Sequence, residues 1–437
     1  MESQASEAHE MLRRAGAAAA SQAGPNNPLA GFLRSALRTR EERLNPFAWY
    51  RERRSVGPIL RDEESQTWDV FGYAQAQSIL RNHTHFSSAR FAGRESGMGE
   101  FTPNILSMDP PRHTELRSLI NLAFTPKAIA ASAPRITEIA EELLKDVSSR
   151  LASHSSTASE EKVMDVVAEL SYPLPVIVIA EMMGVPPADR ELFKKWSDLL
   201  VEGPSDARPE ALMDLMNRKM VGRRELNEYF REIVAHQQKH PRDNLIGALL
   251  EAQLDGEKLS MEELLSFCVL LLAAGNETTT NLITNTWRCL TEHPDALAEV
   301  EANRSMIPGA MEEALRYYSP VQATSRIVLE DVEIEGQQLS KGERVTVWIG
   351  SANRDEKMFS ESESFDIHRS PNPHMAFGYG IHFCLGAPLA RLEAQIALTK
   401  MMEYFTNFES VSAPLEPIVS GFVYGVKSFP MKLTQRQ

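Results

Sequence analysis

Cys384 stands in a segment whose residue types suit a metal-binding thiolate. Residues 377–387 read FGYGIHFCLGA, and three of the positions from 378 to 386 are glycine. Glycine lets the backbone approach a flat ligand closely. Because a helix is expected to begin after Cys384, the free N–H groups at its N-terminus would lower the pKa of the thiol and tune a bound metal. The alternative is an ordinary buried cysteine in a glycine-rich turn, but the spacing Phe-x-x-Gly-x-x-x-Cys-x-Gly before a helix favours a ligand.

A second candidate site lies within the longest helix that the sequence predicts. A Ser-x-x-Glu capping box at residues 260–263 starts this helix, and no strong stop follows before Pro294. At 1.5 Å per residue, roughly 30 residues form a rod of about 45 Å, enough to cross the molecule. Residues 264–274 are apolar on nearly all sides and should be buried, yet Gly275 and Glu277 follow directly. Glycine and a carboxylate inside a buried helix both cost stability, so we expect function at this position.

The positions of apolar residues and prolines predict a mainly α-helical protein with small β-sheets. Residues 112–304 are almost wholly helical in pattern, and the segments FTP, YPLP, GVPP and HPRD separate the helices. Residues 325–350 alternate apolar and polar side chains around glycine-containing turns, which predicts β-hairpins, and a helix returns at residues 387–405. We expect residues 1–40 to be a poorly ordered extension and residues 41–437 to form a single domain.

Composition narrows the classes of function. The 437 residues carry 46 basic and 60 acidic side chains, a formal net charge of -14. This charge argues against nucleic acid as the main ligand, because phosphate binding needs a basic surface. The three cysteines, Cys268, Cys289 and Cys384, fit neither a disulfide framework nor a zinc site, so a reducing compartment is expected. No run reaches the ~18 apolar residues that cross a bilayer and no signal peptide is evident, so we expect a cytoplasmic protein with no membrane partner.

Four motifs of this sequence, which follow one another in the family's order, resemble the signatures of the cytochrome P450 family, the haem-thiolate monooxygenases, in its soluble bacterial form. Besides the cysteine segment, residues 274–278 (AGNET) resemble the oxygen-binding kink of the family's central helix. Glu313 and Arg316 resemble the Glu-x-x-Arg pair beneath the haem, and residues 352–369 resemble the meander that completes its ion-pair network. Alone, such a pair is usually a solvated helix contact, but four ordered motifs are jointly specific. The resemblance covers nearly the whole chain after about residue 45 and implies the P450 fold, with haem between the long central helix and the cysteine loop.

The resemblance implies that Cys384 is the axial ligand of the haem iron. Phe377 would pack beside the thiolate, and Gly386 would let the haem lie close. The cofactor should be haem b, held without a covalent bond because the chain has no Cys-x-x-Cys-His. Considered without the family, the basic residues at positions 113 and 117 more often form an exposed helix face. Four side chains are expected to bind the haem propionates: His113, Arg117, Arg326 and His382.

Glu277 and Thr278 are the residues that the resemblance assigns to catalysis. A thiolate ligand favours O–O cleavage, and this cleavage also consumes protons. Thr278 would hydrogen-bond dioxygen or an ordered water, Glu277 would relay protons from solvent, and Gly275 would relieve backbone crowding. The alternatives are a threonine that bonds back to the preceding helical turn and a glutamate in a buried ion pair. A carboxylate directly before a threonine favours the relay.

The implied reaction is insertion of one oxygen atom from O2 into a medium-sized lipophilic substrate, such as a terpenoid, steroid, fatty acid or macrolide-like compound. Electrons would come from NAD(P)H through a separate reductase and a ferredoxin or flavodoxin, because we expect no fused flavin domain. We expect a monomer. The substrate contacts implied by the resemblance are mostly apolar: Phe91, Ala273, Ala274, Val321, Ala323, Phe422 and Val423.

Two other functions remain open at this point. One is a peroxygenase of the same fold that uses hydrogen peroxide, although relatives of that kind tend to lack the acid and alcohol found here at Glu277 and Thr278. The other is a haem protein without catalysis, serving as a sensor or carrier. Retention of the oxygen-activating helix argues against the second.

Overall fold

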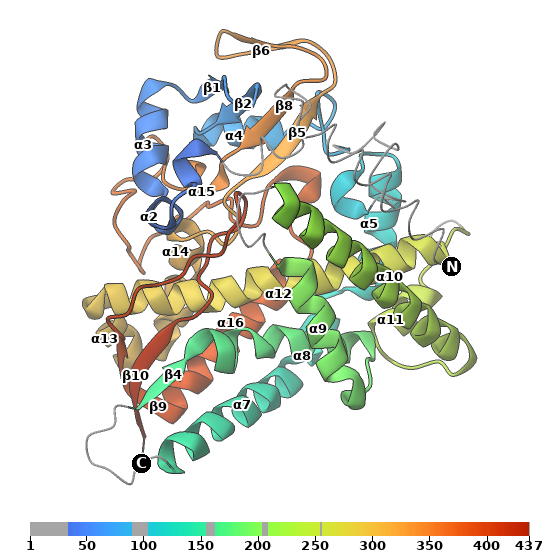
Figure 1. Ribbon diagram of the computed structural model, residues 1–437, viewed down its shortest axis with the longest axis vertical. Coiled ribbons are helices and arrows are strands. Elements are labelled where there is room, and N and C mark those ends of the chain that lie inside the picture. The colour runs from blue at the N-terminus through green and yellow to red at the C-terminus, as the bar shows by residue number, and fades with distance from the viewer. Residues whose placement is uncertain (1–33, 90–103, 154–161, 203–208, 254–255, 437) are drawn as a thin grey trace.

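Helix α12 (Met261–Glu292) is the central element of the fold and crosses the whole molecule (Figure 1). Ser260 Oγ accepts the N–H of Glu263 at 3.2 Å, and the Glu263 side chain accepts the N–H of Ser260 at 2.9 Å. The capping box therefore begins this helix as predicted. The computed structural model describes residues 34–89, 104–153, 162–202, 209–253 and 256–436.

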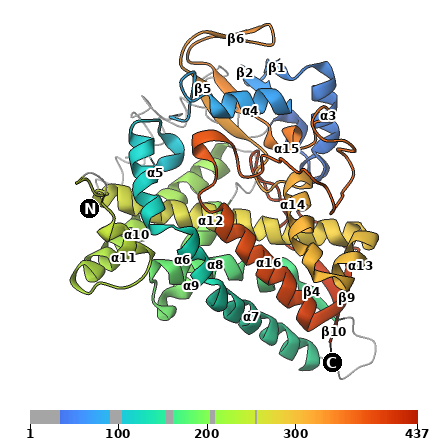
Figure 2. The same ribbon diagram turned by 180° about the vertical axis from the view of Figure 1, so that it is seen from behind.

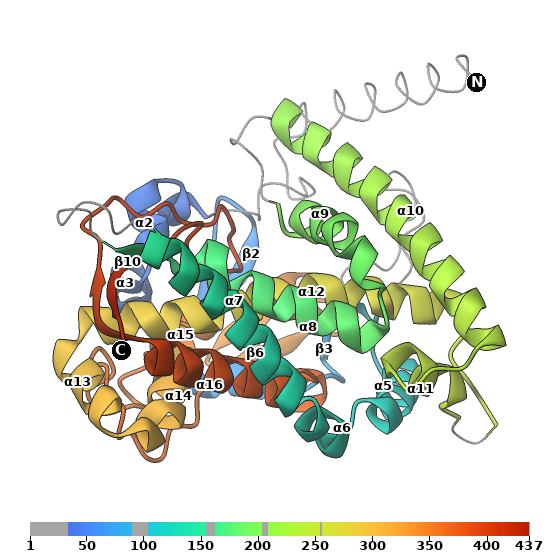
Figure 3. The ribbon, with the colours of Figure 1, turned by 90° about the horizontal axis from the view of Figure 1, so that it is seen from below.

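The main hydrophobic core forms where α12 packs against other helices. In Figure 3, α9 and α10 lie on one side of α12, and α14 and α16 lie on the other. Most residues of α8 are apolar and buried, because its sequence PLPVIVIAEMM offers no polar face. The helices that build this core around α12 are α7 (Ala133–Ser153), α8 (Pro173–Met183), α9 (Arg190–Val201), α10 (Pro209–Lys239), α14 (Ile307–Tyr317) and α16 (Ala387–Tyr404).

Shorter helices fill the periphery and connect the core to the sheets. The α-helices are α2 (Arg40–Leu44), α3 (Phe47–Val56), α4 (Tyr73–Arg81), α5 (Arg112–Ala123), α6 (Pro126–Ala131), α11 (Leu245–Glu251), α13 (Pro294–Ala302) and α15 (Ile349–Ala352). A π-helical turn, η3, spans Val167–Ser171. The 3-10 turns are η1 (Ser35–Leu37), η2 (Ile105–Ser107), η4 (Pro187–Asp189), η5 (Arg304–Met306) and η6 (Gly380–His382).

The β-structure is small and lies at two edges of the helical core. A five-stranded sheet has the order β1-β2-β8-β5-β3, in which only the β2–β8 pair is parallel. Its strands are β1 (Ile59–Asp62), β2 (Thr67–Val70), β8 (Arg344–Val347), β5 (Thr324–Val328) and β3 (Phe86–Ser87). A second sheet has the order β4-β10-β9, formed by β4 (Val163–Asp165), β10 (Pro430–Gln435) and β9 (Phe405–Ser410).

The hairpin predicted within residues 325–350 is present. Strands β6 (Val332–Ile334) and β7 (Gln337–Leu339) pair antiparallel. Glu335 and Gly336 connect them with φ angles of 53° and 75°, and positive φ at both positions is typical of a two-residue hairpin turn. The mainly helical architecture with small sheets is therefore confirmed.

Residues 34–40 fall in the segment that we expected to be an extension, yet the side chain of Arg34 packs on the five-stranded sheet. The Arg34 side chain is only 6% exposed. Its guanidinium donates to Thr67 Oγ1 at 2.7 Å and to Asp69 Oδ1 at 2.5 Å. A buried guanidinium needs such partners, so the folded unit includes the chain from Arg34 onward. Residues 1–33 lie outside the described part of the chain. Among the described residues, no helix combines the length and the apolarity needed to span a bilayer.

Candidate active site

The glycines of the cysteine segment allow it to fold tightly against its neighbours. Gly378 and Gly380 have φ angles of 75° and 73°, a region that side chains disfavour. A Cβ at Gly380 would lie 2.6 Å from the Leu80 carbonyl oxygen at the end of α4, so only glycine fits there. The backbone N–H of Cys384 donates to the Phe377 carbonyl at 2.9 Å and closes the loop. Helix α16 begins three residues after the cysteine.

Opposing influences act on the thiol of Cys384. Burial raises its pKa, while the backbone N–H groups of Gly386 and Ala387 and the positive charges of Arg117 and Arg391 act in the opposite direction. We expected helix N–H groups to lower the pKa; they do contribute in that sense, but burial outweighs them. A bound metal cation deprotonates a thiol outright, and the surrounding donors suit the resulting thiolate.

The other two cysteines lack this environment. Cys268 and Cys289 lie inside α12 with exposed fractions of 1% and 0%. Burial raises the pKa of Cys268 to about 12 and that of Cys289 well above its usual value. Of the three cysteines, Cys384 therefore offers the sulfur best suited to a metal.

Three of the four expected propionate-binding residues gather beside the cysteine segment, which lies next to α5 in Figure 2. Arg117 Nη2 donates to the Phe383 carbonyl at 2.8 Å. The rings of His113 and His382 lie 4.3 Å apart. Arg326, on β5, is buried and donates to the Ser325 carbonyl at 2.9 Å.

The environment of His113 fits an anionic group. Its side chain is 2% exposed, so it does not belong to an exposed basic face, the alternative weighed from the sequence. Neither ring nitrogen has a hydrogen-bond partner among the described residues. Burial lowers the pKa of His113 the most, and the positive charge of Arg117 lowers it further. Because a buried imidazole without partners is costly, this position suits the carboxylate of a haem propionate.

Thr278 makes the backbone contact that we weighed as its alternative role. Its Oγ1 donates to the Ala274 carbonyl at 2.7 Å, one turn earlier in α12. The hydroxyl oxygen can still accept a hydrogen bond in this arrangement. Apart from the neighbouring backbone of α12 itself, a Cβ at Gly275 would meet no atom within 4 Å among the described residues, and α12 remains α-helical here. The expected relief of crowding at the oxygen site stays a prediction.

Glu277 has a strongly altered affinity for protons. Burial raises its pKa to about 7, and attraction to Lys219 of α10 opposes the rise. Lys219 itself donates to the Leu200 carbonyl at 2.9 Å. Burial lowers the pKa of Lys219, while Glu277 and Glu202 act to raise it. Glu277 forms no ion pair with a described side chain, so it can exchange a proton near neutral pH.

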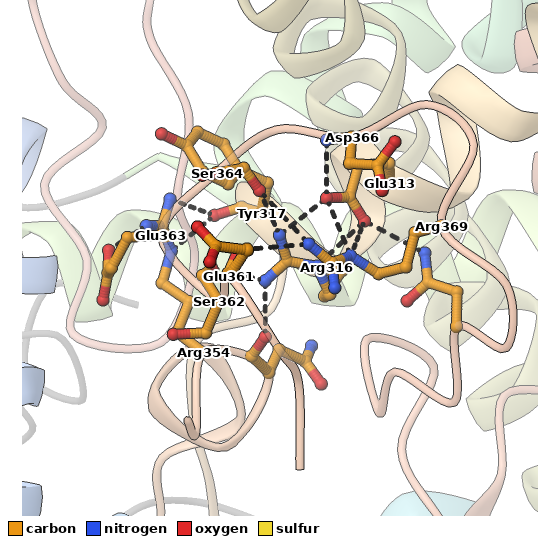
Figure 4. A network of polar contacts seen from close by, with 12 residues as sticks. Glu313, Arg316, Tyr317, Arg354, Glu361, Ser362, Glu363, Ser364, Asp366 and Arg369 are labelled. Carbon is orange, nitrogen blue, oxygen red and sulfur yellow. Dashed lines mark hydrogen bonds and ion pairs between the residues drawn. The ribbon is translucent and has the colours of Figure 1, made fainter. Parts of the chain in front are cut away.

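Glu313 and Arg316 of α14 form a fully buried, two-point ion pair (Figure 4). The two hydrogen bonds measure 2.6 and 2.8 Å, and both side chains are 0% exposed. Arg369 donates to Glu313 at 3.1 Å. The remaining donors of Arg316 reach the carbonyls of Asn353, Ser362 and Ser364 at 3.0, 2.7 and 2.8 Å. The meander therefore completes the hydrogen bonding of this pair.

A family model described as "Cytochrome P450" matches residues 23–430. The chain belongs to the cytochrome P450 family. Cytochrome P450 109 of Bacillus spizizenii is 43% identical over 400 residues, which cover 91% of this chain and 94% of that protein. Substrate-free CYP109E1 from Bacillus megaterium has a TM-score of 0.83 and 44% identity, with 90% of this chain and 100% of that chain covered. Its complex with testosterone has a TM-score of 0.79 and 44% identity, with coverages of 89% and 99%. The expected fold and the expected class, a haem-dependent monooxygenase, are confirmed.

The expected substrate contacts of this P450 divide into two groups. Val321 and Val423 form an isolated β-bridge, and the N–H of Gln322 donates to the Phe422 carbonyl at 2.7 Å. These two segments thus run side by side. Ala323 is 3% exposed and packs in an aromatic cluster, against which Phe422 also packs. Ala273 and Ala274 lie on α12 just before the catalytic candidates, and Phe91 lies outside the described residues.

Sequence reasoning missed three charged residues of this P450 that act on the candidate site. Lys219 faces Glu277 from a helix almost 60 residues earlier, and nothing local in the sequence marks it. Arg391 follows Cys384 by seven residues on α16 and acts on its thiol. Glu312 binds Arg391. The position of Arg391 in the first turns of the helix after the cysteine was a usable signal.

Proposed function

We propose that this P450 inserts one oxygen atom from O2 into a lipophilic substrate of about steroid size, with Cys384 as the axial ligand of the haem iron. The observation that carries this proposal is the site at Cys384. A glycine-dependent loop and helix N–H groups meet there beside His113, whose ring nitrogens have no hydrogen-bond partner among the described residues. The testosterone complex of CYP109E1 supports the substrate class. The apolar segments at Val321 and Val423 are consistent with it.

Several groups of this chain would hold the cofactor. Cys384 would bind the iron, with its sulfur stabilised by the N–H groups of Gly386 and Ala387. Phe377 would pack beside it. A thiolate-bound haem supplies the electron density that favours O–O cleavage. The propionates would be bound by the basic residues His113, Arg117, Arg326 and His382.

Glu277 and Thr278 would deliver protons in this proposal. With a pKa of about 7, Glu277 can take a proton from solvent and release it within the site. Thr278 donates its hydroxyl proton to the Ala274 carbonyl, so its oxygen can accept a hydrogen bond from the water that carries the proton. Separate electron carriers, a ferredoxin or flavodoxin reduced by NAD(P)H, would supply the electrons to this cytoplasmic, monomeric enzyme.

The test of the proposed function is turnover of candidate substrates by the haem-loaded protein. Steroids, terpenoids and fatty acids are first screened for the absorption change that follows substrate binding. The compounds that bind are then incubated with a ferredoxin–reductase pair and NADPH, or with hydrogen peroxide alone. We expect a mono-oxygenated product with NADPH. Product with peroxide alone would identify a peroxygenase, and the absence of product under both conditions would contradict an enzymatic role for these ligands.

Glu277→Gln should slow turnover by about 10²–10⁴-fold at neutral pH, the usual contribution of a general acid. Because burial raises the pKa of Glu277 to about 7, the parent carries the transferable proton below that pH and loses it above. The parent rate should therefore fall as pH rises through about 7, and the variant should not show this fall. Since burial penalises the charged form, the neutral amide should leave stability at pH 8 unchanged or higher. An identical pH–rate profile in the variant would contradict the relay.

Thr278→Ala should uncouple electron consumption from product formation. The variant should still bind haem and substrate and consume NADPH, but product per NADPH should fall severalfold while released peroxide rises, because the proton-bearing water loses its partner. Thr286→Ala is the matched control, since Thr286 makes the same 2.7 Å bond to a carbonyl one turn earlier in α12. Equal coupling in the parent and both variants would show that Thr278 is only a helix residue.

A further inference from the structure

Glu312 of α14 bonds both to Arg391 of α16, the helix that follows Cys384, and to His374, which precedes the cysteine segment. Its two carboxylate oxygens accept from Arg391 Nε and Nη2 of α16 at 2.6 and 2.9 Å. The Nε2 atom of His374 lies 3.0 Å from the same carboxylate. Burial raises the pKa of Glu312, but the bonds from Arg391 and His374 outweigh it and hold the pKa at about 2. Glu312 is therefore a fixed anion at physiological pH.

Both partners of Glu312 touch the cysteine segment. The Arg391 guanidinium lies over the ring of Phe377, 4.5 Å from its centroid. The Phe377 carbonyl accepts the N–H of Cys384 at 2.9 Å. His374 Nδ1 accepts the N–H of Ala376 at 3.3 Å, directly before Phe377. The charge of Arg391 also acts on the Cys384 thiol. The carboxylate of Glu312 thus sets where this guanidinium lies and how far its charge is neutralised.

We propose that Glu312 is a positioning residue that tunes the reduction potential of the haem: it holds Arg391 over Phe377 beside Cys384 and neutralises part of the positive charge there. This inference rests on the proposed role of Cys384. A positive charge near the haem favours the reduced state, which carries one more electron, and neutralising that charge lowers the potential. Arg391 is 37% exposed and Glu312 32%, so solvent screening limits the effect. The planar guanidinium group of Arg391 also lies over the ring of Phe377, and the ammonium group of a lysine cannot reproduce this planar contact.

The test measures the reduction potential of the haem-loaded protein by spectroelectrochemical titration. Glu312→Gln should shift the one-electron equilibrium toward the reduced state by about threefold to tenfold, and tenfold corresponds to 59 mV. Arg391→Gln should shift it the other way. In the Arg391→Gln background, Glu312→Gln should have a clearly smaller effect. Glu299→Gln is the matched control, since Glu299 pairs with His368 at 2.8 Å away from the cysteine segment, and its potential should equal that of the parent.

Arg391→Lys separates position from charge. This variant keeps the positive charge but loses the two-point bond to Glu312 and the stacking on Phe377. The reduced carbon-monoxide complex of a thiolate-bound haem has a red-shifted absorption band, and we expect the variant to lose this band faster than the parent does. It also serves as the second variant if Glu312→Gln holds no haem. An unchanged potential in Glu312→Gln, a shift of full size in the Arg391→Gln background, or parent-like spectral stability in Arg391→Lys would overturn the positioning role. If the parent itself lacked the red-shifted band, the proposed role of Cys384 would fail instead.

Discussion

Cys384→Ser is expected to abolish the red-shifted absorption band of the reduced carbon-monoxide complex and to remove monooxygenase turnover. A serine hydroxyl ionises far less readily than a thiol and supplies no soft sulfur ligand, so the electron density that favours O–O cleavage is lost. The loop itself should persist, because its closing bond from the Cys384 N–H to the Phe377 carbonyl involves only backbone. The measurement is the difference spectrum of the reduced protein with and without carbon monoxide, together with product formation.

Cys268→Ser and Cys289→Ser are the matched controls for this result. Both residues lie in α12 and are almost fully buried. A hydroxyl in their place costs stability of the order of 1–3 kcal/mol if it finds no partner, but the carbon-monoxide band of the folded fraction should keep its position. If either control lost the band while Cys384→Ser kept it, the assignment of Cys384 as the ligand would be wrong.

Glu313→Ala is expected to give little folded or haem-loaded protein. The substitution leaves the fully buried Arg316 without its carboxylate partner and also removes an acceptor of Arg369. Breaking one side of a buried ion pair typically costs about 3–5 kcal/mol, a large share of the roughly 5–15 kcal/mol that stabilises a protein. The measurement is the yield of soluble protein, its haem content and its urea-induced unfolding midpoint.

Glu228→Ala provides a control with the same spacing and the opposite surroundings. Glu228 and Arg231 of α10 also form an i,i+3 pair, at 2.9 Å, but their side chains are 66% and 49% exposed. Exposed pairs contribute about 0–1 kcal/mol, so this variant should resemble the parent in yield and unfolding midpoint. Equal behaviour of the two variants would show that burial does not distinguish the pairs.

The sequence by itself determined the features that depend on near neighbours in the chain. The extent of α12 follows from a cap at Ser260, an apolar run and the stop at Pro294, all of which act within about four residues. The turn at Glu335 and Gly336 follows from local φ preferences. The spacing around Cys384, together with three further motifs in order, was enough to predict the family.

Only the tertiary structure decided which charged residues are buried and what faces them. Residue type and spacing alone do not separate Glu313–Arg316 from Glu228–Arg231, because both are Glu-x-x-Arg, and in the sequence only the family resemblance singled out the first pair. The structure shows the physical difference: the first pair is fully buried and the second is exposed. The raised pKa of Glu277 results from desolvation, which attraction to Lys219 of α10, far away in the sequence, only partly offsets. The network of Glu312, Arg391 and His374 joins three separate segments. A local apolar pattern can indicate that a stretch is buried, but which charged groups face each other depends on packing between elements that lie far apart in the sequence.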